Sequence, residues 1–159
     1  MEGALAELLA RTAGPGEIVW IGLRPGRRAP IEVVETAEVT EAGLAGDHRA
    51  RPGRRAVSLI QAEHLPVIAA LAHRPGADLA DLRRNIAVAG LNLLALRDRV
   101  LSLGTARLRI TGPCHPCSRM EEALGPGGYS AMRGHGGMVA EVLQPGRIAR
   151  GDGVAVSEV

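Results

Sequence analysis

Glycine and proline interrupt this chain along its whole length, and their spacing limits what it can fold into. The 159 residues include 21 glycines and 10 prolines, spread throughout rather than pooled in one segment. Glycine accepts backbone conformations with positive φ, and proline fixes φ near the value that many turns need. The distribution therefore predicts many short elements joined by turns in one domain, without a linker between two domains.

The apolar residues between these turns are arranged mostly as in strands. Expected strands cover residues 17–23, 31–39, 55–60, 85–88, 138–143 and 153–157, and residues 100–111 form a hairpin about Gly104. Expected helices cover residues 4–11, about 64–73, 79–84 and a segment after Ser118, whereas residues 41–53 are expected to be a loop. Closely spaced short strands favour a barrel-like closed sheet over a doubly wound parallel sheet. We therefore expect a mainly β (α+β) single domain over residues 1–159, with a few short helices and an N-terminal extension over residues 1–16.

The composition excludes several kinds of chemistry and of partner. All 19 basic residues are arginines, so no lysine is present to form the Schiff base of a pyridoxal-phosphate site. One tryptophan, one tyrosine and no phenylalanine leave little aromatic surface for stacking on bases. The net charge of +2, without a long run of one sign, argues against nucleic acid or a membrane surface as a partner. Because arginine suits bidentate contacts, we expect a small anionic ligand instead.

The start of the chain, MEGALAELLARTAG, lacks the basic region and the long apolar run of a signal peptide. No apolar stretch approaches the roughly 20 residues that a membrane span needs. These features predict a cytoplasmic, soluble protein.

The two cysteines of the chain, Cys114 and Cys117, lie in the segment TGPCHPCSRMEEALGPGG. Their spacing fits a zinc half-site, a redox dithiol, two buried thiols with no task, or one functional thiolate. A zinc site needs four ligands, and the further candidates are His48, His115 and His135, none of which lies in a paired motif. A redox dithiol belongs beside a βαβ unit, whereas this pair follows a hairpin. Buried, inert cysteines are common, so spacing alone does not decide.

The residues that follow the pair favour a single thiolate. Ser118 and Glu121 match the S-x-x-E capping box, which predicts that a helix begins just after Ser118. Cys117 then lies at the helix N-terminus, where backbone N–H groups and the helix dipole favour an anion. A thiolate held there binds a soft metal or carries sulfur. On this hypothesis Cys117 is the functional residue and Cys114 is dispensable.

Other segments carry residue types that suit an anionic ligand. The sequence RRN at residues 83–85 precedes an expected strand, and two guanidinium groups with an amide suit a phosphate or the edge of a heterocycle. Glycines beside Asp47 and His48, and in MRGHGG at residues 132–137, let backbone N–H groups approach an anion closely. Taken alone, each segment fits a solvated arginine pair or a tight turn better than a binding site.

Taken together, the segments resemble the MOSC domain, which is found at the C-terminus of molybdenum-cofactor sulfurases, here in a small stand-alone form. The resemblance covers nearly the whole chain from about residue 17, and it depends on the order and spacing of the motifs. The segments that carry it are GLAGDH (43–48), RAVSLIQAEHL (55–65), LRRNIAVAGLNLLAL (82–96), LGTARLRITGPCHPCSRMEEALGPGGY (103–129), MRGHGG (132–137) and GRIARGDGV (146–154).

The resemblance implies a β-rich, barrel-like fold that binds the pterin-based molybdenum cofactor or transfers sulfur to it. It implies that Cys117 ligates molybdenum or carries a persulfide, and that Arg83 and Asn85 contact the cofactor. The loop residues expected to line the pocket beside them are Asp47, His48 and His135.

In relatives that are enzymes, such as the amidoxime-reducing components, the cofactor reduces N-hydroxylated compounds. The leading hypothesis is therefore a molybdenum-cofactor-binding protein, either an oxidoreductase or a sulfur transferase, that is served by an electron-donor or sulfur-donor protein. The alternative is a non-enzymatic persulfide carrier, or a cofactor-binding module that acts with a partner. A zinc-binding protein is a weaker alternative.

Overall fold

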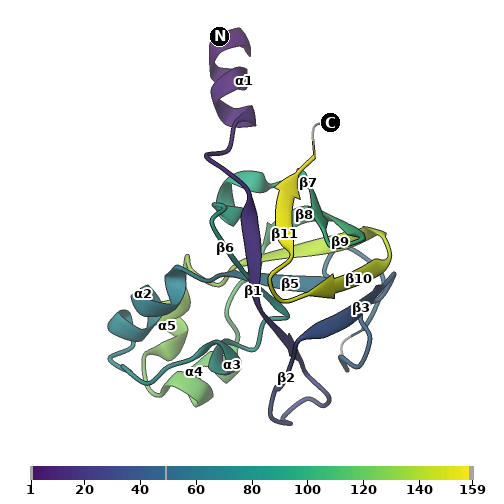
Figure 1. The fold of residues 1–159 in the computed structure, drawn as a ribbon. Coiled ribbons are helices and arrows are strands. Elements are labelled where there is room, and N and C mark those ends of the chain that lie inside the picture. The colour runs from purple at the N-terminus through teal and green to yellow at the C-terminus, as the bar shows by residue number, and fades with distance from the viewer. Residues whose placement is uncertain (1, 49, 158–159) are drawn as a thin grey trace.

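The structure is a computed structural model that describes residues 2–48 and 50–157 (Figure 1). Its strands are β1 (Gly16–Leu23), β2 (Glu32–Val34), β3 (Thr36–Thr40), β4 (Gly43–Leu44), β5 (Val57–Gln61), β6 (Ile86–Ala89), β7 (Val100–Leu103), β8 (Ala106–Pro113), β9 (Met138–Gln144), β10 (Gly146–Ala149) and β11 (Gly153–Val156). Its helices are α1 (Glu2–Ala10), α2 (His64–Leu71), α3 (Leu79–Leu82), α4 (Ser118–Leu124), α5 (Gly128–Met132) and the 3-10 helix η1 (Leu93–Leu96). The described part of the chain contains no helix that is long and apolar enough to cross a membrane.

Seven strands close into a barrel in the order β11-β7-β8-β9-β5-β6-β1, and the pairing of β1 with β11 completes it. Neighbouring strands are antiparallel except β5 and β6, which run parallel because the chain crosses over through α2 and α3 between them. β2 pairs with β1 outside the closed ring, and β10, β3 and β4 form a separate small sheet. The expected closed, mainly β fold with a few short helices is confirmed.

Aliphatic side chains fill the barrel, as a chain without phenylalanine requires. Along β8 the burial alternates, with Ala106, Leu108 and Ile110 buried and the arginines between them exposed. This period of two is the mark of a strand with one face on a core. Because closure of the sheet also removes exposed strand edges, the barrel forms a stable frame that presents its connecting segments.

The helices α2 to α5 gather on one side of the barrel (Figure 1). They share a second, smaller core with one face of β5 and β6, made by Ile60, Ile68, Leu82, Ala87, Met120, Leu124 and Met132. Successive residues of these two strands point to opposite faces, so the strands contribute to both cores. α3 packs against α4. Cys117, just before α4, and Arg83, just after α3, then lie close enough to interact electrostatically.

Among the strands, three segments differ from the expectations. Residues 31–39, expected as one strand, form β2 and β3, which are separated at Glu35 and belong to different sheets. Residues 41–53, expected as loop, contain β4, and residues 146–149, expected to lie among turns, form β10. β10 pairs with β3 from the opposite end of the chain. Such a distant partner leaves no periodic signal in so short a segment, which explains why these strands were missed.

Candidate functional site

The two cysteines lie on the segment that links β8 to α4, and they differ in exposure. Cys114 is buried, and its N–H donates a hydrogen bond to the carbonyl oxygen of Gly137 at 2.8 Å. Cys117 is exposed and occupies the N-cap position of α4. Both thiols are free. The Cys-x-x-Cys pair is therefore asymmetric, because only Cys117 presents its sulfur to solvent.

The predicted capping box at this helix is wrong. α4 begins at Ser118, with Cys117 as its N-cap, and no side chain caps it. Glu121 instead accepts hydrogen bonds at 3.0 Å from the backbone N–H groups of Tyr129 and Gly127, at the start of α5. These two donors lower the pKa of Glu121. Because α4 begins one residue earlier than predicted, Glu121 is the fourth residue of the helix, whereas a capping box needs the acidic residue at the third.

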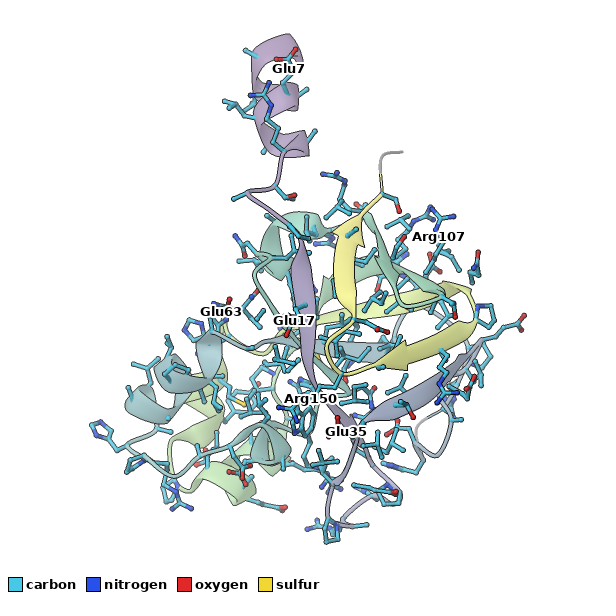
Figure 2. The ribbon with its side chains drawn as sticks, viewed as in Figure 1. Glu7, Glu17, Glu35, Glu63, Arg107 and Arg150 are labelled. Carbon is cyan, nitrogen blue, oxygen red and sulfur yellow. The ribbon has the colours of Figure 1, made fainter. Side chains whose placement is uncertain are left out.

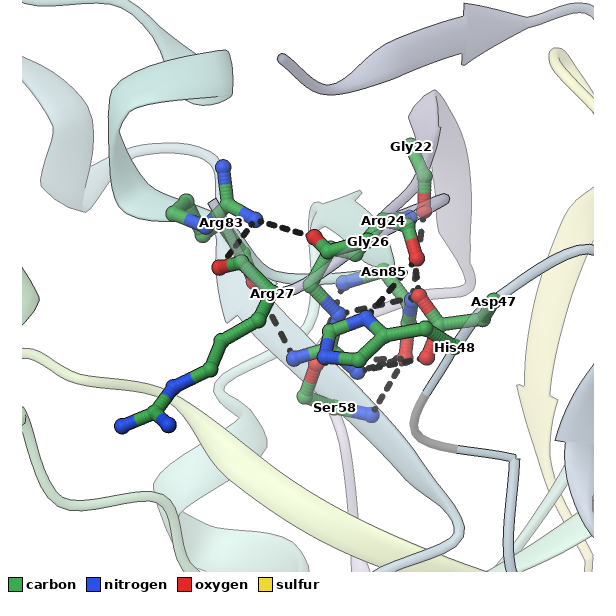
Figure 3. A network of polar contacts seen from close by, with 9 residues as sticks. All are labelled: Gly22, Arg24, Gly26, Arg27, Asp47, His48, Ser58, Arg83 and Asn85. Atoms are coloured by element: carbon green, nitrogen blue, oxygen red, sulfur yellow. Dashed lines mark hydrogen bonds and ion pairs between the residues drawn. The ribbon is translucent and has the colours of Figure 1, made fainter. Parts of the chain in front are cut away.

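An ion pair between Arg24, which follows β1, and Asp47, which follows β4, lies at the base of the site (Figure 3). Asp47 Oδ1 accepts hydrogen bonds from the backbone N and the Nε of Arg24 at 2.8 and 2.9 Å, and Oδ2 accepts one from Nη2 at 2.8 Å. Burial by itself raises the pKa of Asp47, but the hydrogen bonds and the charge of Arg24 outweigh it and leave this pKa below its ordinary value. Asp47 is therefore ionised and fixed in orientation at neutral pH.

Asn85 lies beneath this ion pair and is fully buried. Its Oδ1 accepts hydrogen bonds from the N and Oγ of Ser58 at 3.2 and 3.3 Å, and from Nη2 of Arg24 at 3.4 Å. Its Nδ2 donates to the carbonyl oxygen of Gly22 at 3.2 Å and to Asp47 Oδ1 at 3.4 Å. These bonds use both donors and both lone pairs of the amide. Asn85 therefore ties β1, β5 and β6 together and orients the ion pair from below.

Arg83 holds the loop that contains residues 24–30. Its backbone is left-handed, with φ of 54°, at the C-cap of α3. Its guanidinium donates hydrogen bonds to the carbonyl oxygens of Ala29 at 2.8 Å, Gly26 at 3.3 Å and Arg27 at 3.4 Å. The loop is therefore fixed against the end of α3, on the same side of the barrel as α4.

Charged groups of both signs lie around Arg83. Burial lowers the pKa of Arg83, the charges of Arg119 and Arg24 lower it further, and Asp47 and Cys117 act in the opposite direction. Arg24 is already paired with Asp47, whereas Arg83 and Arg119 form no ion pair among the described residues. Cys117 therefore lies close enough to Arg83 for the two groups to interact electrostatically.

Arg84 has a structural role, which the sequence alone did not distinguish from the role of Arg83. It is buried, and its Nε donates to the carbonyl oxygen of Gly136 at 2.8 Å. Its Nη1 donates to that of Leu82 at 3.2 Å, and its Nη2 to that of His115 at 3.4 Å. Arg84 therefore joins the end of α3, the loop after α5 and the segment that leads to Cys117.

The two histidines expected at the pocket lie in different surroundings. His48 belongs to the network, because its backbone N–H donates to the carbonyl oxygen of Arg24 at 2.7 Å and its Nδ1 lies 2.9 Å from the same oxygen (Figure 3). His135 lies apart from it, with its ring edge-on to that of His64 at a centroid distance of 5.1 Å. Its Nδ1 is buried and has no hydrogen-bond partner among the described residues. The structure thus brings Asp47, His48, Arg83 and Asn85 together, and it does not bring His135 to them.

A pocket of about 560 Å³ opens beside the cysteine segment, and sequence reasoning missed it. It lies between the residues just before Cys117 and the helix α5, and its lining residues are His115, Pro116, Tyr129, Ser130, Arg133 and Gly134. No sequence motif marks it, because its walls come from two elements whose packing depends on the fold.

Residues 2–48 and 50–157 contain no group of side chains that could form the expected zinc site. No three side chains of His, Cys, Asp or Glu in these ranges are grouped as a metal site requires. The additional ligands that a zinc site was expected to use do not gather around Cys114 and Cys117; they were His48, His115 and His135.

Two glycines in the loop after α5 allow a matched test of how closely this loop must pack. Gly137 and Gly134 have similar φ values of +88° and +84°. A Cβ at Gly137 would overlap the carbonyl oxygen of Leu59, whereas a Cβ at Gly134 would meet nothing within 4 Å. We expect Gly137→Ala to lower the free energy of unfolding by about 3 kcal/mol or more. Gly134→Ala should cost only about 1 kcal/mol, the cost of the left-handed backbone. Urea unfolding measures both, and equal losses would contradict the close packing at Gly137.

The fold and the site together describe a small β-barrel domain that presents one cysteine beside a group of arginines. The chain belongs to the MOSC domain family, because its sequence matches that family over residues 33–155. This family is associated with binding of the molybdenum cofactor. Among curated proteins, none matches this sequence.

Solved structures of low sequence identity share the fold. YuaD from Bacillus subtilis has a TM-score of 0.78 and 19% identity, over 89% of this chain and 94% of YuaD. YiiM from Geobacillus stearothermophilus has a TM-score of 0.75 and 21% identity, over 91% of this chain and 76% of YiiM. YiiM from Escherichia coli has a TM-score of 0.66 and 19% identity, over 90% of this chain and 70% of that protein. At these identities the likeness concerns the fold alone.

Proposed function

We propose that this chain binds the molybdenum cofactor at the surface around Cys117, with the Cys117 sulfur as ligand of the metal or as carrier of a persulfide. We call the arginines of this surface, Arg27, Arg83 and Arg119, the arginine rim. The observation that carries the proposal is the position of this thiol. It is exposed and free, it lies within electrostatic reach of Arg83, and it precedes Arg119 by two residues. An accessible cysteine beside cationic groups is the kind of cysteine that supplies a soft sulfur ligand to a metal.

The residues of the rim fit the chemistry of this cofactor. Cys117 supplies a soft sulfur donor for molybdenum, and arginine side chains suit the phosphate group of the pterin. Arg119 also donates a hydrogen bond to the carbonyl oxygen of Arg27, which joins α4 to the loop over Arg83. Arg27 itself extends away from the buried network (Figure 3). Positive charge is therefore available at the surface, above the buried network in which Arg24, Asp47 and Asn85 already hydrogen-bond one another.

The roles within the site differ by depth. Arg83, Arg119 and Arg27 would hold the anionic part of the cofactor at the surface. Asn85 and Asp47 would act through Arg24 and the loop above them, because Asn85 is fully buried and Asp47 is engaged with Arg24. When bound, the cofactor supplies the redox chemistry, while the protein supplies orientation and charge.

Metal and pterin analysis of protein purified from its native host tests the proposal. We expect molybdenum and pterin in equal amounts, in proportion to the folded protein. Equimolar zinc without molybdenum would contradict the proposal and support a zinc protein instead.

A persulfide carrier that acts with a partner is the second candidate, and the exposure of Cys117 favours it. A thiol at the surface is accessible to a sulfur-donor or sulfur-acceptor protein, whereas a redox site gains from exclusion of water. Turnover of an N-hydroxylated compound by cofactor-loaded protein, with an electron donor, separates the two. Turnover identifies an oxidoreductase, and full loading without turnover favours the carrier.

A further inference from the structure

We propose that the pocket between the cysteine segment and α5 is the recognition site for the small molecule on which the Cys117 site acts. The geometry points to a planar aromatic compound that carries an anionic group. This inference rests on the proposed function, and it names the class of molecule that the site would select. It concerns a pocket of about 560 Å³, a size usual for small-molecule sites.

The pocket is adjacent to the functional thiol along the chain. His115 and Pro116 form one wall, and Cys117 is the next residue. Arg119, which belongs to the arginine rim, follows on α4 and contacts the loop at Arg27. Cys117 therefore follows the pocket wall directly in the chain and precedes Arg119 by two residues.

The wall formed by α5 is fixed by Glu121. The two oxygens of this carboxylate accept hydrogen bonds from the backbone N–H groups of Gly127 and Tyr129. These are the N-cap of α5 and a residue of its first turn. On the opposite wall, Arg84 holds the carbonyl oxygen of His115. Both walls are thus held by charged side chains that lie outside the pocket lining, which preorganises the pocket before a ligand binds.

The lining side chains define the ligand. Tyr129 is the only tyrosine of a chain without phenylalanine, yet 42% of it is exposed at the pocket wall. Together with Pro116 it offers flat apolar surface, which suits a planar ring. Arg133 is exposed and forms no ion pair among the described residues. A guanidinium so placed suits a carboxylate or another anionic group by charge-assisted hydrogen bonds.

Calorimetric titration of cofactor-free protein with benzoate tests the assignment. Cyclohexanecarboxylate has the same charge without a planar ring, and benzamide has the ring without the charge. We expect benzoate to bind about fivefold more tightly than cyclohexanecarboxylate, the difference that a stacked aromatic pair supplies. On addition of benzoate, amide chemical shifts should change at the pocket residues.

The variants described next should unfold at the same temperature as the unmodified chain, so that a change in affinity reports the pocket.

Two variants and one control assign the parts of the pocket. Arg133→Gln should weaken benzoate about tenfold and leave benzamide unchanged, because only the charge-assisted contact is lost. Tyr129→Leu should weaken both aromatic ligands, since the flat ring is lost. Arg107→Gln is the control, because Arg107 is exposed on the barrel far from the helices (Figure 2). It should change neither affinity.

The outcomes separate this pocket from the cofactor site. Unchanged molybdenum and pterin contents in Arg133→Gln and Tyr129→Leu, measured on protein from the native host, support a ligand pocket distinct from the cofactor. Loss of pterin in these variants would overturn the proposal, because the pocket would then hold the cofactor itself. Benzoate binding that is absent, or equal in all variants, would overturn it as well. Benzoate binding as expected, together with protein from the native host that contains neither molybdenum nor pterin, would contradict the proposed function and leave the pocket assignment standing.

Discussion

Cys117→Ser is expected to abolish molybdenum binding and persulfide formation, whereas Cys114→Ser is expected to retain both. The structure gives the reason, because Cys117 is exposed near Arg83 while Cys114 is buried. Serine keeps the size of cysteine, but its hydroxyl is a hard donor that stays protonated near neutral pH. It therefore replaces neither a soft metal ligand nor a sulfur nucleophile.

The measurement is the ratio of molybdenum to protein in both variants from the native host, with persulfide labelling of cofactor-free protein beside it. We expect Cys117→Ser to lower the ratio by more than about tenfold, because loss of a residue that only supports a metal ligand already weakens metal binding by about tenfold or more. Cys114→Ser places a hydroxyl in a buried position, which should cost about 1 to 3 kcal/mol of stability. Unfolding curves therefore accompany the metal analysis. Equal loss of molybdenum in two folded variants would sink the hypothesis of a single functional thiolate.

The class of fold was predictable because the barrel depends on local patterns. The alternation along β8 and the turn at Gly104 are both visible in the sequence, and each is confirmed. The strands that were missed have another origin. β10 and β4 both pair with β3, and neither short segment carries a pattern of its own. Sequence periodicity reports which face of a strand is buried, but it does not report which strand lies alongside.

The site was predictable in part, for the same physical reason. The functional asymmetry of the cysteine pair stays a prediction, and the structure adds that Cys114 is buried while Cys117 is exposed. The capping box was predicted from four consecutive residues alone. In the structure Glu121 instead accepts hydrogen bonds from two N–H groups at the start of α5. The sequence alone does not show which of the adjacent residues Arg83 and Arg84 is partly exposed and which is buried. Only the packing of α3 turns Arg83 toward the loop and Arg84 toward the interior.

Asp47→Asn is expected to lower the free energy of unfolding by about 3 kcal/mol or more at pH 7, because it leaves the Arg24 guanidinium without its counter-charge. The side chains of the pair are 13% and 2% exposed, with an Nη2–Oδ2 distance of 2.8 Å. Glu35→Gln is the matched control, since its pair with Arg150 is 3.5 Å long and both side chains are mostly exposed. That exposed pair should contribute less than about 1 kcal/mol. Urea unfolding of both variants at pH 7 gives the comparison.

The pH dependence of this difference is the sharper test, because it reports the charge of Asp47 rather than the shape of its side chain. The pKa of Asp47 in the folded chain lies below its ordinary value of 3.8. A carboxyl group with a lowered pKa stabilises the fold fully above its unfolded pKa, and it loses that contribution as the pH falls through the folded pKa. The stability difference between the unmodified chain and Asp47→Asn should therefore be constant from pH 7 to about pH 5 and shrink at lower pH. A difference that stayed constant down to the acid limit of folding would show that the variant acts through lost packing, and that the ion pair with Arg24 contributes nothing.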